Sequence, residues 1–189
     1  MVDVGAAYNL RVSAPKLTDN INSDRVMNWA KNVLLGEALA AKKGSITTLC
    51  DVGCGAGPQA GLFIRHVKQG SIKRVVCVDL SAEAMVEYKR RVTESSADAS
   101  FTFVRTNFAS PLMPTMLGVQ PGSVDIVHAG LSLHYACASI HTAESTLKNL
   151  CGMLRVGGYL LLCMPNAAEV WTHLRVQVRA MHRRLGFRV

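Results

Sequence analysis

The chain has 189 residues, of which 49% are apolar, and this length is typical of one domain built around one hydrophobic core. The formal net charge of +8 leaves two interpretations open, an anionic partner such as RNA or a nucleotide, or simply a basic domain. No uninterrupted apolar run reaches the roughly 18 residues that a membrane span needs, and residues 1–16 show no secretory signal. A soluble, intracellular protein is therefore expected.

Six cysteines are spread along the chain without a Cys-x-x-Cys pair, which argues against a zinc site. Cys50, Cys77 and Cys163 lie in runs typical of strands, and Cys54 lies in a glycine-rich turn. We expect these thiols to be reduced, buried and equivalent to small hydrophobic side chains.

The chain opens with an irregular, polar stretch, and apolar residues at helical spacing then predict a helix from Ser23 to about Ala41. Strands and helices alternate from there on. The predicted strands are Thr47–Val52, Arg74–Asp79, Phe101–Arg105, Val124–Ala129 and Tyr159–Met164. The predicted helices are Gly61–Val67, Ala82–Thr93 with Ser81 as its cap, Thr142–Leu154 and Glu169–Leu185. Short apolar strands separated by helices predict a single α/β domain with a doubly wound, mostly parallel sheet over residues 47–189, preceded by a lid helix at about 23–41.

The first predicted strand runs into a glycine-rich turn, Asp51-Val52-Gly53-Cys54-Gly55-Ala56-Gly57, and a helix follows. Glycines permit a tight turn in which backbone N–H groups approach a ligand, and the N-terminal end of the helix adds a positive field. The glycine spacing differs from the dinucleotide fingerprint G-x-G-x-x-G, which argues against a nicotinamide cofactor.

Polar residues end the next two strands. Asp79 lies 26 residues after Gly53 (79 − 53), where a carboxylate can accept hydrogen bonds from both hydroxyls of a ribose. The alternative role for Asp79, capping the next helix, is less favoured because Ser81 is available for it. Asn107 is either a contact to an adenine edge or a plain turn residue. The turn and Asp79 together favour an adenosyl cofactor.

Four segments resemble the mRNA cap guanine-N7 methyltransferases, and the resemblance covers essentially the whole chain. It implies a class I methyltransferase that uses S-adenosylmethionine, has capped RNA as its partner, and acts in the nucleus, or in the cytoplasm if viral or otherwise specialised. The segments are Tyr8-Asn9; Asn28-Trp29-Ala30-Lys31 with Val33-Leu34-Leu35-Gly36-Glu37; the turn Asp51 to Gly57; and a second half that contains Asp125-Ile126-Val127, His134-Tyr135, Leu154-Arg155-Val156-Gly157-Gly158-Tyr159 and Met164-Pro165-Asn166.

The resemblance assigns residues to two halves of a pocket. The residues implied for the cofactor are Lys31, Asp51, Gly53, Gly55, Asp79, Asn107, Gly130 and Tyr135. Those implied for the cap guanosine are Arg91, His134, Tyr135 and Pro165. Guanine N7 carries an unprotonated lone pair, so no acid or base is expected and His134 and Tyr135 would act by positioning. The alternative for His134 is a purely structural role.

The chain departs from the family's pattern mainly on the cap side. Ala56 stands where the family usually has Lys, and further departures are Gln59, Leu62, Asn107, Gly130 and Ala7. The family also continues with two more strands, so we expect a fragment, or a chain completed by a partner or by a homo-oligomer. Two alternative functions stay open: a non-catalytic module that binds RNA or stimulates a partner, and a methyltransferase for another substrate. Arg175, Arg179 and Arg183 share one face of the last helix, which either is solvated or contacts RNA phosphates.

Overall fold

The computed structural model describes residues 33, 35–41, 46–57, 60–110, 113–130, 132–136 and 139–163. The predictions on Ala7, Lys31, Gln59, Pro165 and the arginine-rich last helix lie outside these residues. In chain order the elements are β1 (Ile46–Val52), α3 (Ala60–Lys68), β2 (Ile72–Asp79), α4 (Ala82–Glu94), η1 (Asp98–Ser100), β3 (Phe101–Arg105), α5 (Met113–Met116), β4 (Val124–Gly130), η2 (Leu133–Ala136), α6 (Ile140–Met153) and β5 (Leu154–Cys163). Residues 35–41 are helical, within the bounds of the helix predicted from Ser23 to about Ala41, and the role of that helix as a lid stays a prediction.

The five strands form one parallel sheet in the order β3-β2-β1-β4-β5. The chain moves outward from β1 through β2 to β3 and then crosses back to β4, so the topological switch point lies between β1 and β4. Ligands in open α/β sheets bind beyond the carboxyl ends of the strands at such a point. The predicted doubly wound fold is confirmed.

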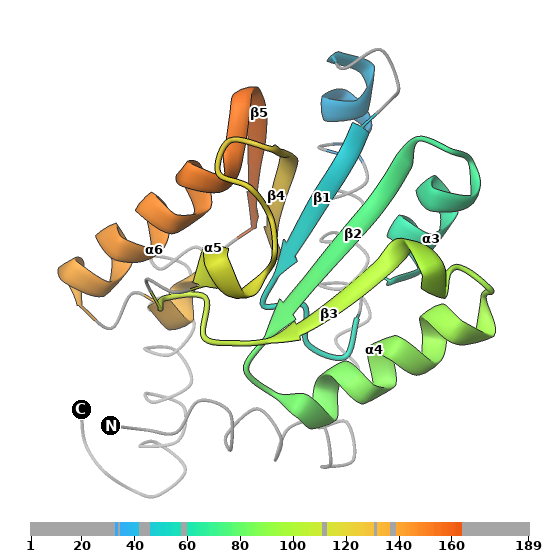
Figure 1. Ribbon diagram of the computed structural model, residues 1–189, viewed down its shortest axis with the longest axis horizontal. Helices are drawn as coiled ribbons and strands as arrows, with labels where there is room; N and C mark the ends of the chain where they lie inside the picture. The colour runs from blue at the N-terminus through green and yellow to red at the C-terminus, as the bar shows by residue number, and fades with distance from the viewer. Residues whose placement is uncertain are drawn as a thin grey trace, which may run out of the picture.

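Helices cover both faces of the sheet, with α3 and α4 on one side and α5 and α6 on the other (Figure 1). The first face packs around Phe63 of α3 and Tyr88 of α4, and the second around Leu150 of α6. Because both faces are covered, strands β1, β2 and β4 are buried along most of their length, as parallel strands usually are. None of the helices in the described part of the chain is long and apolar enough to cross a membrane.

The ends of the helices follow local capping chemistry. Ser81 caps α4 as predicted, because its Oγ accepts a hydrogen bond from the Ala84 N–H at 3.1 Å. Ser139 caps α6 in the same way, so this helix begins at Ile140, two residues before the predicted start. The predicted burial of the thiols is confirmed for Cys50, Cys54 and Cys77.

The start of β5 differs from the prediction. The expected helix to Leu154 ends at Met153, and the strand begins at Leu154 instead of Tyr159. Between its first two pairings β5 advances five residues (154 to 159) while β4 advances two (124 to 126), so three extra residues bulge out. The bulge turns at Gly157, whose φ is +70°. A bulge of this kind follows from long-range pairing with β4, which sequence periodicity does not show.

Candidate functional site

The glycine turn after β1 lies at the carboxyl edge of the sheet, toward the bottom of Figure 1. Gly53, Gly55 and Gly57 have φ angles of +66°, +53° and +70°. Side chains with a Cβ rarely adopt this backbone conformation, so the turn requires glycine at all three positions. The prediction that these glycines form a tight turn is confirmed.

Strand β2 holds one side of the turn. The N–H groups of Gly53 and Cys54 both donate to the carbonyl oxygen of Val78, at 2.7 and 3.0 Å. Asp79 Oδ2 accepts from the Gly55 N–H at 2.7 Å, and its Oδ1 accepts from the Ser81 N–H at 2.8 Å. A carboxylate has about four acceptor sites, so two backbone bonds leave Asp79 capacity for a ligand. Asp79 thus lies at the turn and orders it.

The other side of the turn is held from β4. Ser132, buried just beyond that strand, donates from Oγ to the carbonyl oxygen of Val52 at 2.7 Å. A Cβ placed on Gly53 would lie 2.2 Å from the Ser132 Cβ, so only glycine leaves room for this serine. The sequence reasoning missed Ser132, because nothing in its neighbourhood indicates which turn it contacts.

Asp51 is buried directly beneath the turn. Its Oδ1 lies 2.8 Å from Nδ1 of His128, the residue beside it on β4, and its Oδ2 accepts from the Tyr88 hydroxyl at 3.4 Å. Sequence reasoning missed both partners. A signal did exist for His128, since a histidine inside an otherwise apolar strand needs a polar partner. A role of Asp51 toward the cofactor stays a prediction.

Two titratable groups at the turn, the Tyr88 phenol and the Cys54 thiol, stay protonated at neutral pH. Burial, followed by the nearby Asp51 charge, raises the pKa of the Tyr88 phenol well above its ordinary value. A hydrogen bond with the Cys77 thiol, followed by burial, raises the pKa of Cys54. Cys54 is therefore a thiol and not a thiolate nucleophile, although it lies in the middle of the turn. Gly57 packs against Tyr88, whose ring atoms would lie 2.4 Å from an added Cβ.

Asn107 and Gly130 lie at the same edge as the turn. Asn107 follows β3, is exposed, and accepts the Ala109 N–H on its Oδ1 at 2.9 Å, as an Asx turn does. This bond agrees with the turn interpretation and leaves the side-chain amide N–H groups for the predicted adenine contact. Gly130 is the last residue of β4.

The residues predicted for the guanosine fall in two places. His134 and Tyr135 lie in η2 beyond β4, with ring centroids 4.1 Å apart and planes tilted by 37°, and Tyr135 is 37% exposed. Arg91 on α4 bonds to the Gly57 carbonyl oxygen at 3.4 Å and to Glu87 at 2.8 Å. Hydrogen bonds from Arg90 and Arg91 lower the pKa of the Glu87 carboxyl to about 2. Arg91 is therefore placed beside the turn.

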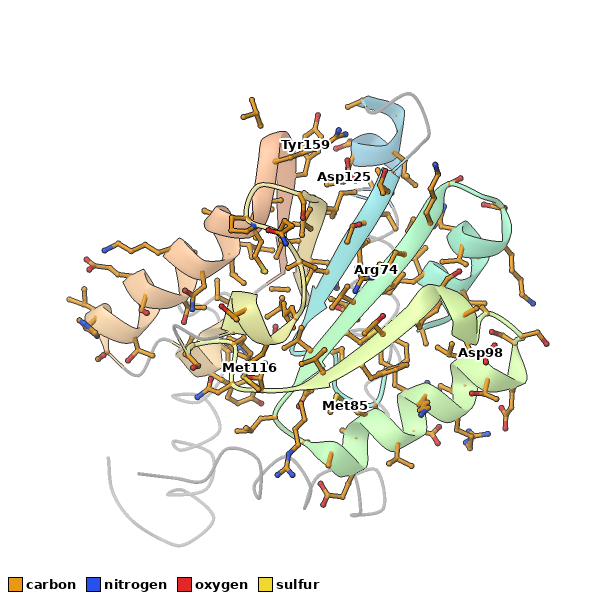
Figure 2. All side chains as sticks on the ribbon, viewed as in Figure 1. Arg74, Met85, Asp98, Met116, Asp125 and Tyr159 are labelled. Atoms are coloured by element: carbon orange, nitrogen blue, oxygen red, sulfur yellow. The ribbon has the colours of Figure 1, made fainter. Side chains whose placement is uncertain are left out.

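Apolar side chains are exposed at this otherwise polar edge. Leu80, directly after Asp79, is 39% exposed, and Met116 of α5 is 51% exposed. Met116 projects at the carboxyl-end side of the sheet, far from Asp125 and Tyr159 at the opposite end (Figure 2). Its sulfur lies 3.2 Å from Thr106 Oγ1, on the segment that leads from β3 to Asn107. A carboxylate at a glycine turn with apolar neighbours is suited to a ligand that has a ribose and a flat base.

Comparison with known proteins identifies the relatives of this chain. The chain is 25% identical over 156 residues to the mRNA cap guanine-N(7) methyltransferase of Schizosaccharomyces pombe, which covers 82% of the chain and 42% of that protein. It is also 25% identical over 162 residues to the enzyme of the same name from Drosophila melanogaster, covering 78% of the chain and 37% of that protein. The chain thus spans about two fifths of the length of these curated relatives.

Solved structures agree on the fold. A DszA carbon methyltransferase superposes with a TM-score of 0.61 at 18% identity, covering 80% of this chain and 38% of that one. A methyltransferase from Geobacter sulfurreducens in complex with S-adenosyl-L-homocysteine superposes with a TM-score of 0.53 at 20% identity, covering 85% and 55%. These similarities confirm the class I methyltransferase fold. The model of the mRNA (guanine-N(7))-methyltransferase domain matches residues 8–188, and the chain belongs to that family.

Proposed function

We propose that this chain binds S-adenosylmethionine at the glycine turn and transfers its methyl group to N7 of the guanine in an mRNA cap. The observation that carries the proposal is the arrangement of Asp79, whose Oδ2 accepts from the Gly55 N–H of the turn and whose Oδ1 accepts from the Ser81 N–H, while the residue stays partly exposed. Membership of the cap methyltransferase family supports the choice of substrate.

The residues of the turn fit the cofactor. Asp79 retains acceptor capacity for the ribose hydroxyls, and Leu80 and Met116 offer apolar surface for the adenine next to Asn107. Gly53 and Gly55 bring the backbone close to the methionine end, beside the buried carboxylate of Asp51. Lys31 remains proposed as the partner of the cofactor's carboxylate.

The cap guanosine is proposed to lie between η2 and α4. The adjoining rings of His134 and Tyr135 come from beyond β4, and Arg91 of α4 bonds to the Gly57 carbonyl of the glycine turn. These side chains offer aromatic surface and hydrogen-bond donors to a purine, and Pro165 is proposed to close against the base.

The proposed reaction requires these residues to align the guanine with the methyl group, and it requires no proton transfer. When bound, the cofactor supplies a methyl group that its sulfonium already activates. Guanine N7 presents a free lone pair, so His134 and Tyr135 contribute by holding the base in line, with reacting atoms about 3 to 3.5 Å apart. The high pKa of Tyr88 and Cys54 fits this account, because neither group is a base or a nucleophile at neutral pH.

The test is a radiolabelled methyl-transfer assay with the 189-residue chain and GpppRNA, followed by nuclease digestion to locate the label. We expect label on the cap guanine, lost in Asp79→Ala and retained in Asp98→Ala, an exposed carboxylate on η1 away from the turn. Label on another position or molecule contradicts the proposed substrate.

A non-catalytic module that binds RNA or stimulates a partner is the second candidate. The observation that favours it is Ala56, which leaves the turn without the lysine usual in the family. Binding of S-adenosylhomocysteine and capped RNA without any transfer supports this candidate. Under either function the proposed partner is capped RNA, with action in the nucleus, and a homo-oligomer or a second chain that completes the pocket remains proposed.

A further inference from the structure

A histidine of strand β4, His128, contacts Asp51, which lies two residues before the first glycine of the cofactor turn. His128 and Asp51 lie opposite each other where β4 pairs with β1, and His128 Nδ1 is 2.8 Å from Asp51 Oδ1. The two side chains are only 8% and 4% exposed. The pair lies between β1 and β4, at the topological switch point of the sheet. His128 belongs to neither half of the proposed pocket.

The chemistry of the pair fixes which atom carries the proton. An ionised carboxylate only accepts hydrogen bonds, so Nδ1 of His128 must carry the hydrogen and donate it. The imidazole ring also packs edge to face on Phe63 of α3, with centroids 5.4 Å apart at 78°. The ring is thus held from two sides, in one orientation and one tautomer when it is neutral.

His128 is a stronger partner for Asp51 than Tyr88 is. The hydroxyl of Tyr88 reaches Asp51 Oδ2 at 3.4 Å, beyond the usual 2.5 to 3.0 Å of such bonds, whereas the histidine bond is of ordinary length. The orientation of the Asp51 carboxylate therefore depends mainly on His128.

Side chains from both neighbouring strands contact the turn, the Asp79 carboxylate from β2 and two side chains from the β4 side. On the β2 side, two of its N–H groups bond to a backbone carbonyl, that of Val78, which any residue at that position supplies. On the β4 side, the contacts come from side chains, Ser132 on Val52 and His128 on Asp51. Gly53, the first glycine of the turn, lies two residues after Asp51, so the bond between Asp51 and His128 holds the end of β1 that leads into the turn.

We propose that His128 is a positioning residue for the cofactor turn, holding Asp51 so that residues 53–57 keep the conformation that binds S-adenosylmethionine. The inference rests on the proposed function for the identity of the cofactor, and it does not depend on the methyl acceptor. It makes His128, a residue in the middle of a buried strand, a determinant of cofactor affinity.

Four variants test the inference. His128→Leu removes the donor, His128→Asn offers an amide N–H near the position of Nδ1, and His128→Gln places its amide near Nε2 instead. Tyr88→Phe removes the weaker partner of Asp51. Affinity for S-adenosylhomocysteine is measured by calorimetry on the 189-residue chain, at a temperature where circular dichroism shows every variant folded.

We expect His128→Leu and His128→Gln to bind about 10- to 100-fold more weakly than the unaltered chain, as loss of a bond to a charged group predicts. His128→Asn and Tyr88→Phe should stay within about threefold, because each keeps or barely changes the strong bond. Amide hydrogen exchange supplies a second readout. Exchange should accelerate at residues 53–57 in the weak binders and stay unchanged in β3.

A purely structural histidine gives a different pattern. In that case the His128 variants have lower melting temperatures, but the folded molecules bind S-adenosylhomocysteine normally, with the same affinity for His128→Asn and His128→Gln. This pattern overturns the inference. If His128→Leu fails to fold, the comparison of His128→Asn with His128→Gln decides.

A chain that binds S-adenosylhomocysteine with the expected variant pattern and does not methylate GpppRNA contradicts the proposed function alone. An unaltered chain without affinity for S-adenosylhomocysteine overturns the inference on His128.

Discussion

Two buried aspartates at opposite ends of the same sheet show how partners separate a structural carboxylate from one at a site. Asp125, 2% exposed, lies at the amino end of β4, and its Oδ2 accepts from the N–H groups of Thr47 and Thr48 at 2.8 and 3.0 Å. Its Oδ1 lies 2.5 Å from Arg155 Nη2. Asp51, 3% exposed, lies at the carboxyl end of β1 and bonds to the side chains of His128 and Tyr88.

The difference lies in what each carboxylate connects. Asp125 joins the starts of β1 and β5 to β4, at the end of the sheet where Figure 2 labels it together with Tyr159, far from the glycine turn. Asp51 connects side chains of β4 and α4 to the turn itself. Burial and residue type are the same, so only the partners indicate that Asp125 supports the fold and Asp51 the site.

Removing the carboxylate of Asp125 should give the largest effect on stability. We expect Asp125→Ala to lower the free energy of unfolding by about 3 to 4 kcal/mol, because two backbone N–H groups lose their acceptor. Arg155 adds little to this loss, since its side chain is 44% exposed and solvent screens the pair. Urea unfolding measures the change, with Asp98→Ala as an exposed control within about 0.5 kcal/mol. If Asp125→Ala kept its stability and lost affinity for the cofactor, Asp125 would support the site and not the fold.

Asp79→Ala should act on the ligand more than on the fold. We expect S-adenosylhomocysteine to bind about 30- to 150-fold more weakly, a loss of about 2 to 3 kcal/mol, because bonds to the ribose and to the Gly55 N–H both disappear. Calorimetry measures the affinity of the folded variant, with Asp98→Ala again as the control. Unchanged affinity would show that the ribose binds elsewhere.

A pair of glycine substitutions sharpens the comparison at the turn. Gly53 and Gly70 both have positive φ angles, but a Cβ meets Ser132 at position 53 and nothing within 4 Å at position 70. Gly70→Ala should therefore cost about 1 kcal/mol from backbone strain, and Gly53→Ala about 2 kcal/mol more from the steric conflict.

The double variant Gly53→Ala with Ser132→Gly isolates that conflict. Removing the serine side chain opens the space beside position 53, so a double-mutant cycle from urea unfolding should show a favourable coupling between the two substitutions. Additive losses would mean that the turn moves away from Ser132 instead of packing against it.

His134→Ala should have the smallest effect on stability. The ring lies against that of Tyr135 in the short η2 turn, which is partly exposed, so we expect a change within about 0.5 kcal/mol and weaker binding of a cap analogue. Thermal unfolding and a fluorescence titration with the analogue measure the two quantities. A large loss of stability would instead support the structural role for this histidine.

Much of the fold was predictable because its signals are local. The glycine turn, the strand before it and the Ser81 cap depend on neighbouring residues, and the structure confirms them. The bulge at the start of β5 was not predictable, since Leu154 and Tyr159 take their places from pairing with β4. The short elements η1, α5 and η2 were not predicted either, because three or four residues are too few to show a hydrophobic periodicity.

The sequence by itself determined the family, the alternation of strands and helices, and the placing of Gly53, Gly55 and Asp79 at strand ends. Tertiary structure alone decided which partners those ends acquire. Asp51 and His128 are separated by 77 positions, and Ser132 and Val52 by 80. The physical reason is the sequence distance over which each effect acts. Backbone preferences act over a few neighbouring residues, whereas the register of β1 against β4 sets contacts between side chains far apart in the chain. That register places an imidazole on Asp51 and backbone N–H groups on Asp125.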